Sequence, residues 1–261
     1  MSGDNAVPVD VRLVWGPSGA RSLGADVDVA VVVDVLSFTT TVSVAADRGV
    51  TVLPCAAYNV HAATLAAQHD AVLAVRRSEA RPGDVSLSPG SVRAAAGLRR
   101  LVLPSPNGST LSRLLGADDR AVVAASLRNA SSVAAWIAAT AAEITRPLRV
   151  ALVPAGERRA DGSVRQAPED VWGAGAVMES LTTAAPAVAS PRAAAALTAW
   201  REVARRPGRA LRLSRTGVDL TDAGFASDVA VAAEVGTSVA VPLLRDGAYV
   251  DVAPLGRRAT P

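Results

Sequence analysis

One aspartate stands at the end of a strongly apolar run and is followed by a cluster of hydroxyl side chains. The run covers residues 29–33 and ends at Asp34, and Ser37, Thr39 and Thr40 follow within six positions. If a helix begins near Ser37, its free amide groups and the hydroxyls form an anion site beside the carboxylate. Such a pair suits a metal ion that bridges to a phosphate, or a phosphoryl acceptor. The alternative is that Asp34 and Ser37 only cap the helix.

Three further loops follow predicted strands and carry polar residues or glycine. They cover residues 107–110, 126–129 and 154–157. The carboxyl ends of parallel strands share one edge of a sheet, so these loops are expected to converge on Asp34. Gly108 would let a backbone amide approach an anion closely. Each loop also has an ordinary explanation, since Asn-Gly is a common turn and asparagine a common helix cap.

Four carboxylates are available to hold a divalent ion. They are Asp34, Glu157, Glu169 and Asp170. Magnesium prefers such oxygen ligands and usually keeps water and substrate phosphate in its shell. Glu169 and Asp170 also follow Pro168 at a predicted helix start, where acids complement the helix dipole. The metal role and the dipole role therefore remain alternatives.

The elements that must position these residues alternate between strand and helix. Strands are predicted over residues 9–15, 29–33, 50–54, 71–75, 100–103, 121–125 and 148–153. Helices are predicted over residues 37–47, 59–68, 91–96, 109–115, 129–143 and 168–181. This order predicts a three-layer α/β/α protein with a mixed, largely parallel sheet. The apolar run before Asp34 lacks polar alternation, which fits a strand covered on both faces.

The remaining segments are predicted from turn residues and composition. Loops are expected over residues 16–24, 76–90 and 156–168, a linker over 184–189, and helices over 191–204, 208–214 and 222–234. Residues 238–244 and 248–252 flank Asp246-Gly247 and predict a hairpin. We expect one domain over residues 1–253, with a possible subdivision near 184–190, and a disordered tail over 254–261.

Composition excludes several classes of protein. All 27 basic residues are arginine, the net charge is only +3, and aromatic residues make up 3%, which does not favour nucleic-acid binding. No apolar stretch reaches the roughly 18 to 20 residues of a membrane span, and the N-terminus lacks the features of a signal peptide. One cysteine and two histidines exclude an internal disulfide and a histidine-rich metal cluster. We therefore expect a cytoplasmic protein.

Several known phosphatase chemistries lack their required residues. Cys55 has no arginine-bearing anion loop around it, and His61 and His69 have no partner motif. Leu36 stands where haloacid-dehalogenase phosphatases need a second aspartate. No Walker loop and no Gly-x-Ser-x-Gly elbow occurs.

Six short motifs follow one another along most of the chain. They are DVLSFTTT at 34–41, SP at 88–89, SPNGST at 105–110, LRNA at 127–130, PAG at 154–156, and ED at 169–170 with AG at 174–175; Asp228 and residues 238–242 follow. In this order they resemble the motifs of the 2-phosphosulfolactate phosphatases. The resemblance implies a magnesium-dependent acid phosphatase that hydrolyses 2-phosphosulfolactate to sulfolactate, a step in coenzyme M synthesis.

The chain departs from the motifs of that family at two places. Ser37 and Phe38 stand where the family usually has arginine and a small residue, so one phosphate or sulfonate contact is missing. The Gly-Glu-Arg segment of the family is replaced by VRRSE at 75–79, where Glu79 either takes the place of the glutamate or does not. Two alternatives stay open: a phosphatase for another phosphorylated hydroxy acid, and a non-catalytic anion-binding protein.

The resulting hypothesis is Mg²⁺-dependent hydrolysis of a small anionic phosphate monoester by a protein that we expect to be a homo-oligomer. The assigned residues are Asp34, Asn107 and Asn129 for catalysis, Ser37, Thr39, Thr40, Gly108, Ser109, Thr110 and Arg128 for substrate binding, and Asp34, Glu169 and Asp170 for the metal. The ion would polarise the phosphoryl oxygens and help to generate a hydroxide nucleophile. Backbone amides would stabilise the developing charge, and Arg128 would pair with a second acidic group. Covalent attack by Asp34 is the lesser alternative.

Overall fold

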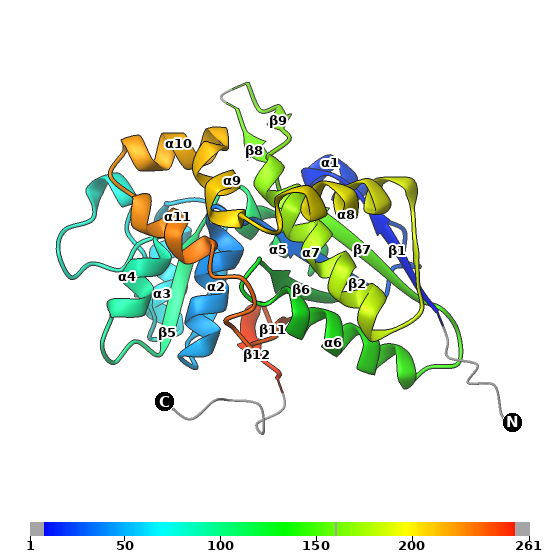
Figure 1. The fold of residues 1–261 in the computed structure, drawn as a ribbon. Helices are drawn as coiled ribbons and strands as arrows, with labels where there is room; N and C mark the ends of the chain where they lie inside the picture. Colours follow the sequence, from blue (N-terminus) through cyan, green and yellow to red (C-terminus); the bar gives the residue numbers. More distant parts are fainter. Residues whose placement is uncertain (1–7, 160, 254–261) are drawn as a thin grey trace, which may run out of the picture.

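The apolar run before Asp34 forms β2(Val29–Val33), an inner strand of a ten-stranded sheet (Figure 1). The structure is a computed structural model and describes residues 8–159 and 161–253. The strands lie in the order β10, β1, β7, β2, β6, β11, β12, β3, β5, β4. Their bounds are β1(Val9–Leu13), β3(Thr51–Cys55), β4(Val72–Leu73), β5(Arg100–Pro104), β6(Ala121–Ala125), β7(Leu148–Pro154), β10(Ala187–Ala189), β11(Pro242–Arg245) and β12(Ala248–Asp251). A separate hairpin consists of β8(Glu157–Arg158) and β9(Val164–Arg165).

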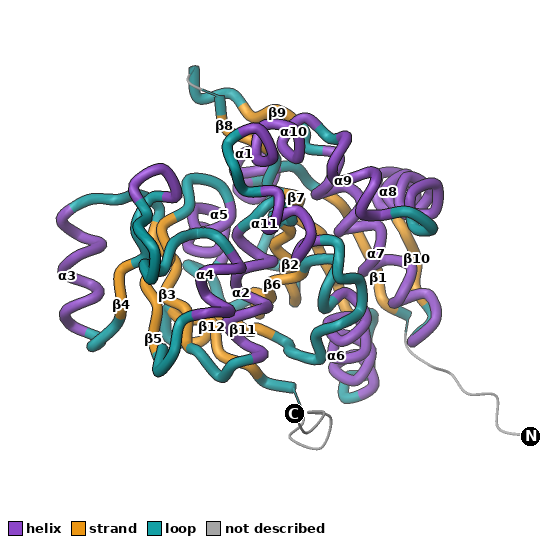
Figure 2. Tube along the Cα trace, turned by 60° about the vertical axis from the view of Figure 1, so that its left-hand side comes forward, coloured by secondary structure: helices purple, strands orange, loops and turns teal. Residues whose placement is uncertain are grey.

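Helices cover both faces of the sheet. Their bounds are α1(Gly16–Arg21), α2(Phe38–Asp47), α3(Val60–Gln68), α4(Pro89–Ala94), α5(Gly108–Leu115), α6(Ala130–Ala142), α7(Pro168–Ala184), α8(Pro191–Val203), α9(Pro207–Leu213), α10(Arg215–Asp222) and α11(Ala226–Ala232), with a 3₁₀ turn at Arg77–Glu79. Figure 2 shows α3 and β4 at one end of the sheet and α8 and β10 at the other. None of the helices in the described residues combines the length and apolar character that a membrane crossing requires.

The side chains of β2 pack on both sides of the sheet. Val29, Val31 and Val33 pack in the same core as residues of α6, α7 and α8. Ala30 and Val32 pack with α1 and α5 on the opposite face. All five residues are at most 1% exposed, which is why the strand reads as a continuous apolar run. The predicted three-layer α/β/α fold with a mixed sheet is confirmed.

The sheet consists of two parallel groups joined by an antiparallel hairpin. Strands β10, β1, β7, β2 and β6 are mutually parallel, and so are β3, β5 and β4. The β11–β12 hairpin pairs antiparallel with β6 on one side and with β3 on the other. The strands of the second group therefore run antiparallel to those of the first. The loop after β5 nonetheless reaches the end of β2, where the Gly108 amide donates to Asp34 Oδ2.

Several segments differ from their sequence predictions. The expected loop over 16–24 begins with α1, since proline near the first helical position is pre-organised for a helix. The expected loop over 156–168 contains the β8–β9 hairpin, and the expected linker over 184–189 contains the edge strand β10. The predicted helix over 222–234 is interrupted after α10, where Gly224 has a φ of +88°. The predicted tail over 254–261 lies outside the described residues.

Candidate active site

Asp34 follows β2 directly and its side chain is buried beneath the start of α2. The residue is 5% exposed. Its Oδ2 accepts a hydrogen bond from the Gly108 amide at 2.9 Å, and its Oδ1 accepts a longer one from the Phe38 amide at 3.4 Å. The backbone of Asp34 is fixed as well, because its N–H donates to Thr39 Oγ1 and its carbonyl accepts from the Thr39 amide. The carboxylate therefore has one defined orientation between two strand-end loops.

Gly108 permits the close approach of the β5 loop to Asp34. A Cβ atom at this position would lie 2.2 Å from a Phe38 ring carbon and 2.8 Å from Asp34 Oδ2. Real side chains do not tolerate such distances, so only glycine allows this amide to reach the carboxylate. The predicted arrival of this loop at Asp34 is thus observed, but its amide binds the carboxylate in place of a free anion site.

The first turn of α7 brings two more acids to the same place. Asp170 accepts from the Val35 amide through Oδ1 at 2.8 Å and from the Gly156 amide through Oδ2 at 2.9 Å. It thereby joins the ends of β2 and β7. Glu169 is 1% exposed, and its Oε2 has no hydrogen-bond partner among the described residues. The helix can approach because Gly173 has no side chain: a Cβ there would lie 2.7 Å from Val33 Cγ1 and 2.7 Å from Val35 Cγ2.

The three acids influence one another electrostatically. Burial raises the pKa of Asp34 to about 6, the Gly108 and Phe38 amides oppose this rise, and the charge of Glu169 adds to it. The pKa of Asp170 is raised well above its ordinary value, first by burial and then by the charges of Asp34 and Glu169. Closely spaced, buried carboxylates of this kind gain from a positive charge between them.

The donor chemistry fits a hard divalent cation held by two acids. Magnesium commonly takes one or two protein carboxylates and completes its shell with water and phosphate. Asp34 and the unpartnered Oε2 of Glu169 supply such oxygens. Both oxygens of Asp170 accept amide hydrogen bonds, as those of Asp34 do, so this residue also braces the ends of two strands. Its metal role stays a prediction. Within the described residues, no three or more His, Cys, Asp or Glu side chains form a preassembled metal cluster.

Arg77 lies at the site although it was not among the predicted site residues. Its Nη2 donates to the hydroxyl of Ser37 and its Nε lies 3.1 Å from Asp228 Oδ2. Its positive charge lowers the pKa of Asp34, against the larger effect of burial. A guanidinium thus lies beside Ser37, the position at which the chain lacks the arginine of the family motif. Glu79, by contrast, is 65% exposed and pairs with Arg76 at 3.5 Å.

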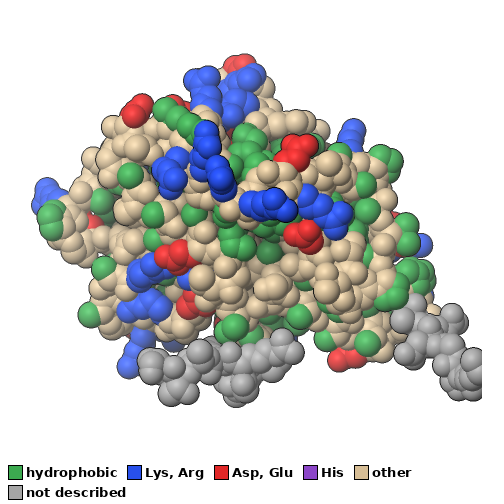
Figure 3. Space-filling model, viewed as in Figure 1, with side chains coloured by type: hydrophobic (Ala, Val, Ile, Leu, Met, Phe, Trp, Pro, Cys, Tyr) green, Lys and Arg blue, Asp and Glu red, His purple; other side chains and the backbone are tan. Residues whose placement is uncertain are grey.

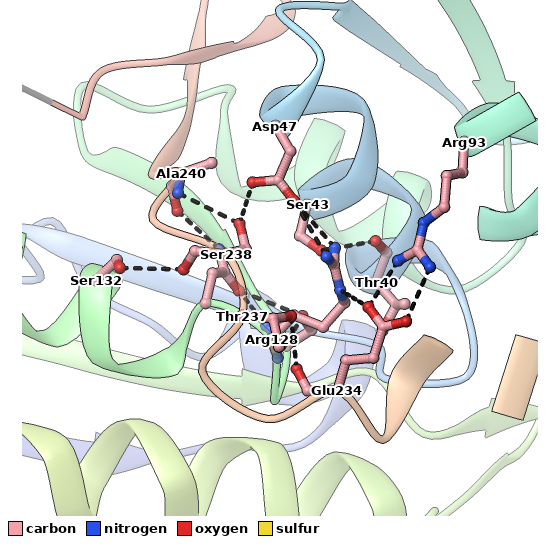
Figure 4. A network of polar contacts seen from close by, with 12 residues as sticks. Thr40, Ser43, Asp47, Arg93, Arg128, Ser132, Glu234, Thr237, Ser238 and Ala240 are labelled. Atoms are coloured by element: carbon pink, nitrogen blue, oxygen red, sulfur yellow. Dashed lines mark hydrogen bonds and ion pairs between the residues drawn. The ribbon is translucent and has the colours of Figure 1, made fainter. Parts of the chain in front are cut away.

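Arg128 lies elsewhere, in a polar network along the second half of α2 (Figure 4). Its guanidinium donates to Ser43 Oγ at 3.1 Å and forms ion pairs with Asp47 at 3.1 Å and Glu234 at 3.2 Å. Glu234 is shared with Arg93. Its donors hold α2 to the 234–238 segment. The substrate contact of Arg128 stays a prediction.

Asn129 also makes contacts within the fold, and its catalytic role stays a prediction. Its Oδ1 accepts from the Ser126 amide at 2.8 Å, and its Nδ2 donates to the carbonyls of Ala124 and Ala240. The residue is fully buried. Its amide therefore stabilises the end of β6 and the adjacent 240 segment, and no polar atom of the side chain is left to orient a substrate.

The hydroxyls of the site bind mainly to backbone carbonyls. Thr39 Oγ1 donates to Asp34, Thr40 Oγ1 to Val35 and Ser109 Oγ to Leu103, each at 2.8 Å. These contacts fix the loops and leave the predicted substrate-binding roles of the three residues unsupported. Asn107 Oδ1 accepts from the Arg158 amide at 3.3 Å, and Thr110 lines a pocket of 450 Å³ that also includes Arg158. Their roles stay predictions.

Known proteins resemble this chain along most of its length. The family described as 2-phosphosulpholactate phosphatase matches residues 20–247. A protein of Deinococcus radiodurans named probable 2-phosphosulfolactate phosphatase is 36% identical over 227 residues, which cover 84% of this chain and 89% of that protein. The family match includes the Asp34 strand end, the Gly108 loop and the acids of α7. The chain therefore belongs to the 2-phosphosulfolactate phosphatase family of phosphoric monoester hydrolases.

Proposed function

We propose that this protein hydrolyses 2-phosphosulfolactate to sulfolactate and phosphate, and that the reaction requires Mg²⁺. Family membership supports the substrate. The observation that carries the metal requirement is the buried Oε2 of Glu169, which has no partner among the described residues and lies in the same acidic cluster as Asp34. Two carboxylates with unused acceptor capacity in a buried position are suited to a hard cation.

Asp34 and Glu169 would hold the ion, with Asp170 bracing them. When bound, Mg²⁺ would supply Lewis-acid stabilisation of the charge on the phosphoryl oxygens. The Gly108 and Phe38 amides keep Asp34 in one orientation, so little reorganisation is needed at this residue. Hydrolysis adds a water oxygen to phosphorus, breaks the phosphorus to ester-oxygen bond, and returns a proton to the sulfolactate hydroxyl.

The ionisation of Asp34 links the metal to pH. Only the ionised carboxylate binds a cation, and its pKa of about 6 means that protons compete below this pH. A fall in pH through about 6 therefore protonates Asp34 and weakens Mg²⁺ binding. The Mg²⁺ concentration required for half-maximal turnover should therefore rise as the pH is lowered from 7.5 to 5.5.

The surface near the site favours an anionic substrate. Arginine side chains gather over the β8–β9 hairpin and the helices α9 and α10 beside it (Figure 3). The exposed arginines of these segments include Arg158, Arg159, Arg209, Arg212 and Arg215. The hairpin begins immediately after Gly156, which contacts Asp170. Positive charge next to the strand ends would raise the rate of encounter with a polyanionic ester at low salt.

We propose a cytoplasmic enzyme in the synthesis of coenzyme M, acting as a homo-oligomer. Fractionation of cells and light scattering of the purified protein test the location and the oligomer separately from catalysis.

The decisive assay measures phosphate release from 2-phosphosulfolactate in Mg²⁺ and in EDTA, with 2-phospholactate and 3-phosphoglycerate as other esters. We expect release from 2-phosphosulfolactate that depends on Mg²⁺ and is lost in Asp34→Asn. Asp26→Asn, which changes a half-exposed aspartate before β2, is the matched control and should remain active. Preference for another ester would identify a different substrate, and no release from any ester would leave an anion-binding protein.

A further inference from the structure

Arg77 presents a guanidinium at the active site in a fixed position. Its Nη2 donates to the Ser37 hydroxyl and, at 3.4 Å, to the Leu87 carbonyl. Its Nε lies 3.1 Å from Asp228 Oδ2, and its Cζ lies 5.6 Å from the centre of the Phe225 ring. Contacts from three segments of the chain thus orient this one side chain: Ser37, Leu87 and the start of α11.

Asp228 is the anchor of this arrangement. It is 1% exposed, and its Oδ1 accepts a hydrogen bond from the Ser88 hydroxyl. Burial lowers the pKa of Arg77, and the charges of Asp228 and then Asp34 oppose this fall. Asp228 lies on α11, so this ion pair fixes the guanidinium of Arg77 from a separate helix.

Part of the guanidinium is left for a ligand. An arginine has five N–H donors, and within the described residues no acceptor binds Nη1 of Arg77. The side chain keeps 17% of its surface exposed. The planar fork of arginine matches carboxylate, sulfonate and phosphate groups in a bidentate manner.

The charges around Asp34 indicate which group Arg77 binds. Asp34, Glu169 and Asp170 form the acidic side of the site, where a cation would meet the phosphoryl group. Arg77 stands on the side of Ser37, and its positive charge lowers the pKa of Asp34 from a distance. An ester with its phosphate on the acidic side would place its other acidic group toward Arg77.

We propose that Arg77 binds the acidic group of the substrate that does not react, a carboxylate or a sulfonate, and so selects phosphate esters that carry a second acid. Asp228 is a positioning residue for Arg77. This inference rests on the proposed function, because it assigns a role within the same reaction.

The test compares Arg77→Gln with wild type on four esters. These are 2-phosphosulfolactate, 2-phospholactate without the sulfonate, 1-sulfopropan-2-yl phosphate without the carboxylate, and isopropyl phosphate without either. We expect kcat/KM for 2-phosphosulfolactate to fall at least about tenfold, mainly through KM, as for the loss of a charged hydrogen bond, and to be unchanged for isopropyl phosphate. The single-acid ester that is sensitive to the substitution carries the acid that Arg77 binds, and the insensitive one lacks it. An equal loss on all four esters, or none, overturns the proposal.

Two further measurements keep the outcomes separable. Arg76→Gln is the matched control, since Arg76 is 53% exposed and stacks on Tyr58 at 4.6 Å. Where Arg77→Gln alone unfolds because Asp228 loses its partner, the double variant Arg77→Gln/Asp228→Asn removes the unpaired charge. Calorimetric binding of sulfolactate should be lost in the Arg77 variants and kept in the Arg76 variant. If wild type hydrolyses no ester, the proposed function fails while this binding still reports on Arg77, and a wild type that binds no sulfolactate overturns the inference.

Discussion

Asp34 is held in its buried position at a cost in stability, and Asp34→Asn should make this cost measurable. Burial raises the pKa of the carboxyl from 3.8 to about 6. At about 1.4 kcal/mol per pKa unit, ionised Asp34 destabilises the folded state by about 3 kcal/mol relative to its protonated form. Asparagine has nearly the same shape and no charge, but its NH₂ group loses one amide contact at about 1 kcal/mol. Asp34→Asn should therefore raise the free energy of unfolding by about 2 kcal/mol at pH 7.5.

The sign of the pH dependence follows from the raised pKa. Between about pH 4 and 6 the folded protein keeps the proton on Asp34 while the unfolded chain releases it, so rising pH destabilises wild type. Below about pH 4 both states are protonated and the advantage of asparagine disappears. The difference in unfolding free energy between variant and wild type should thus grow by about 3 kcal/mol from pH 4 to pH 7.

The assay is urea unfolding followed by tryptophan fluorescence, in EDTA, at steps from pH 4 to 7.5. Asp26→Asn controls for the loss of an aspartate outside the cluster. A difference between Asp34→Asn and wild type that does not change with pH would refute the reasoning, as would a variant that is less stable at every pH.

Other parts of the site give three further predictions. Gly108→Ala should cost about 2–3 kcal/mol of unfolding free energy by overpacking against Phe38, seen as a lower urea midpoint; a stability within error of wild type would contradict the contact. Glu169→Gln should weaken Mg²⁺ binding at least about tenfold in a calorimetric titration while the circular dichroism spectrum is kept, and unchanged affinity would remove Glu169 from the metal site. Arg128→Met should cost about 3 kcal/mol because Asp47 and Glu234 lose their partner; KM should be unchanged, whereas a large rise would restore the substrate role.

The place of the acidic cluster could be predicted from local sequence. An apolar run that ends in Asp34 indicates a buried strand with a carboxylate at its tip, and Pro168 followed by acids indicates a helix start. Both inferences depend on neighbours in sequence, and the structure places both features where they were expected. The roles of Asp34 and Glu169 in metal binding stay predictions.

The direction of a side chain could not be predicted in this way. Arg128 and Asn129 follow a strand end as Asp34 does, yet they turn toward Asp47 and toward backbone carbonyls. A loop sequence does not reveal which of several buried acceptors will take a donor. Arg77 was missed for a related reason, since its loop has no periodic pattern and its anchor Asp228 lies on a distant helix.

The order of the strands in the sheet could not be predicted from local sequence either. The hairpin around Asp246-Gly247 was predicted and is present, but nothing in its sequence indicates that it is inserted between β6 and β3. That insertion reverses the polarity of β3, β5 and β4, so a simple parallel edge does not explain why Gly108 meets Asp34.

The central claim is that the cluster around Asp34 and Glu169 carries Mg²⁺-dependent phosphatase activity. It is tested most directly by the kcat/KM of wild type and Asp34→Asn for 2-phosphosulfolactate at saturating Mg²⁺, with both proteins shown to be folded. We expect a loss of about a hundredfold to a thousandfold in the variant, as for removal of a group that acts on the transition state. A variant that retains wild-type kcat/KM would contradict the account.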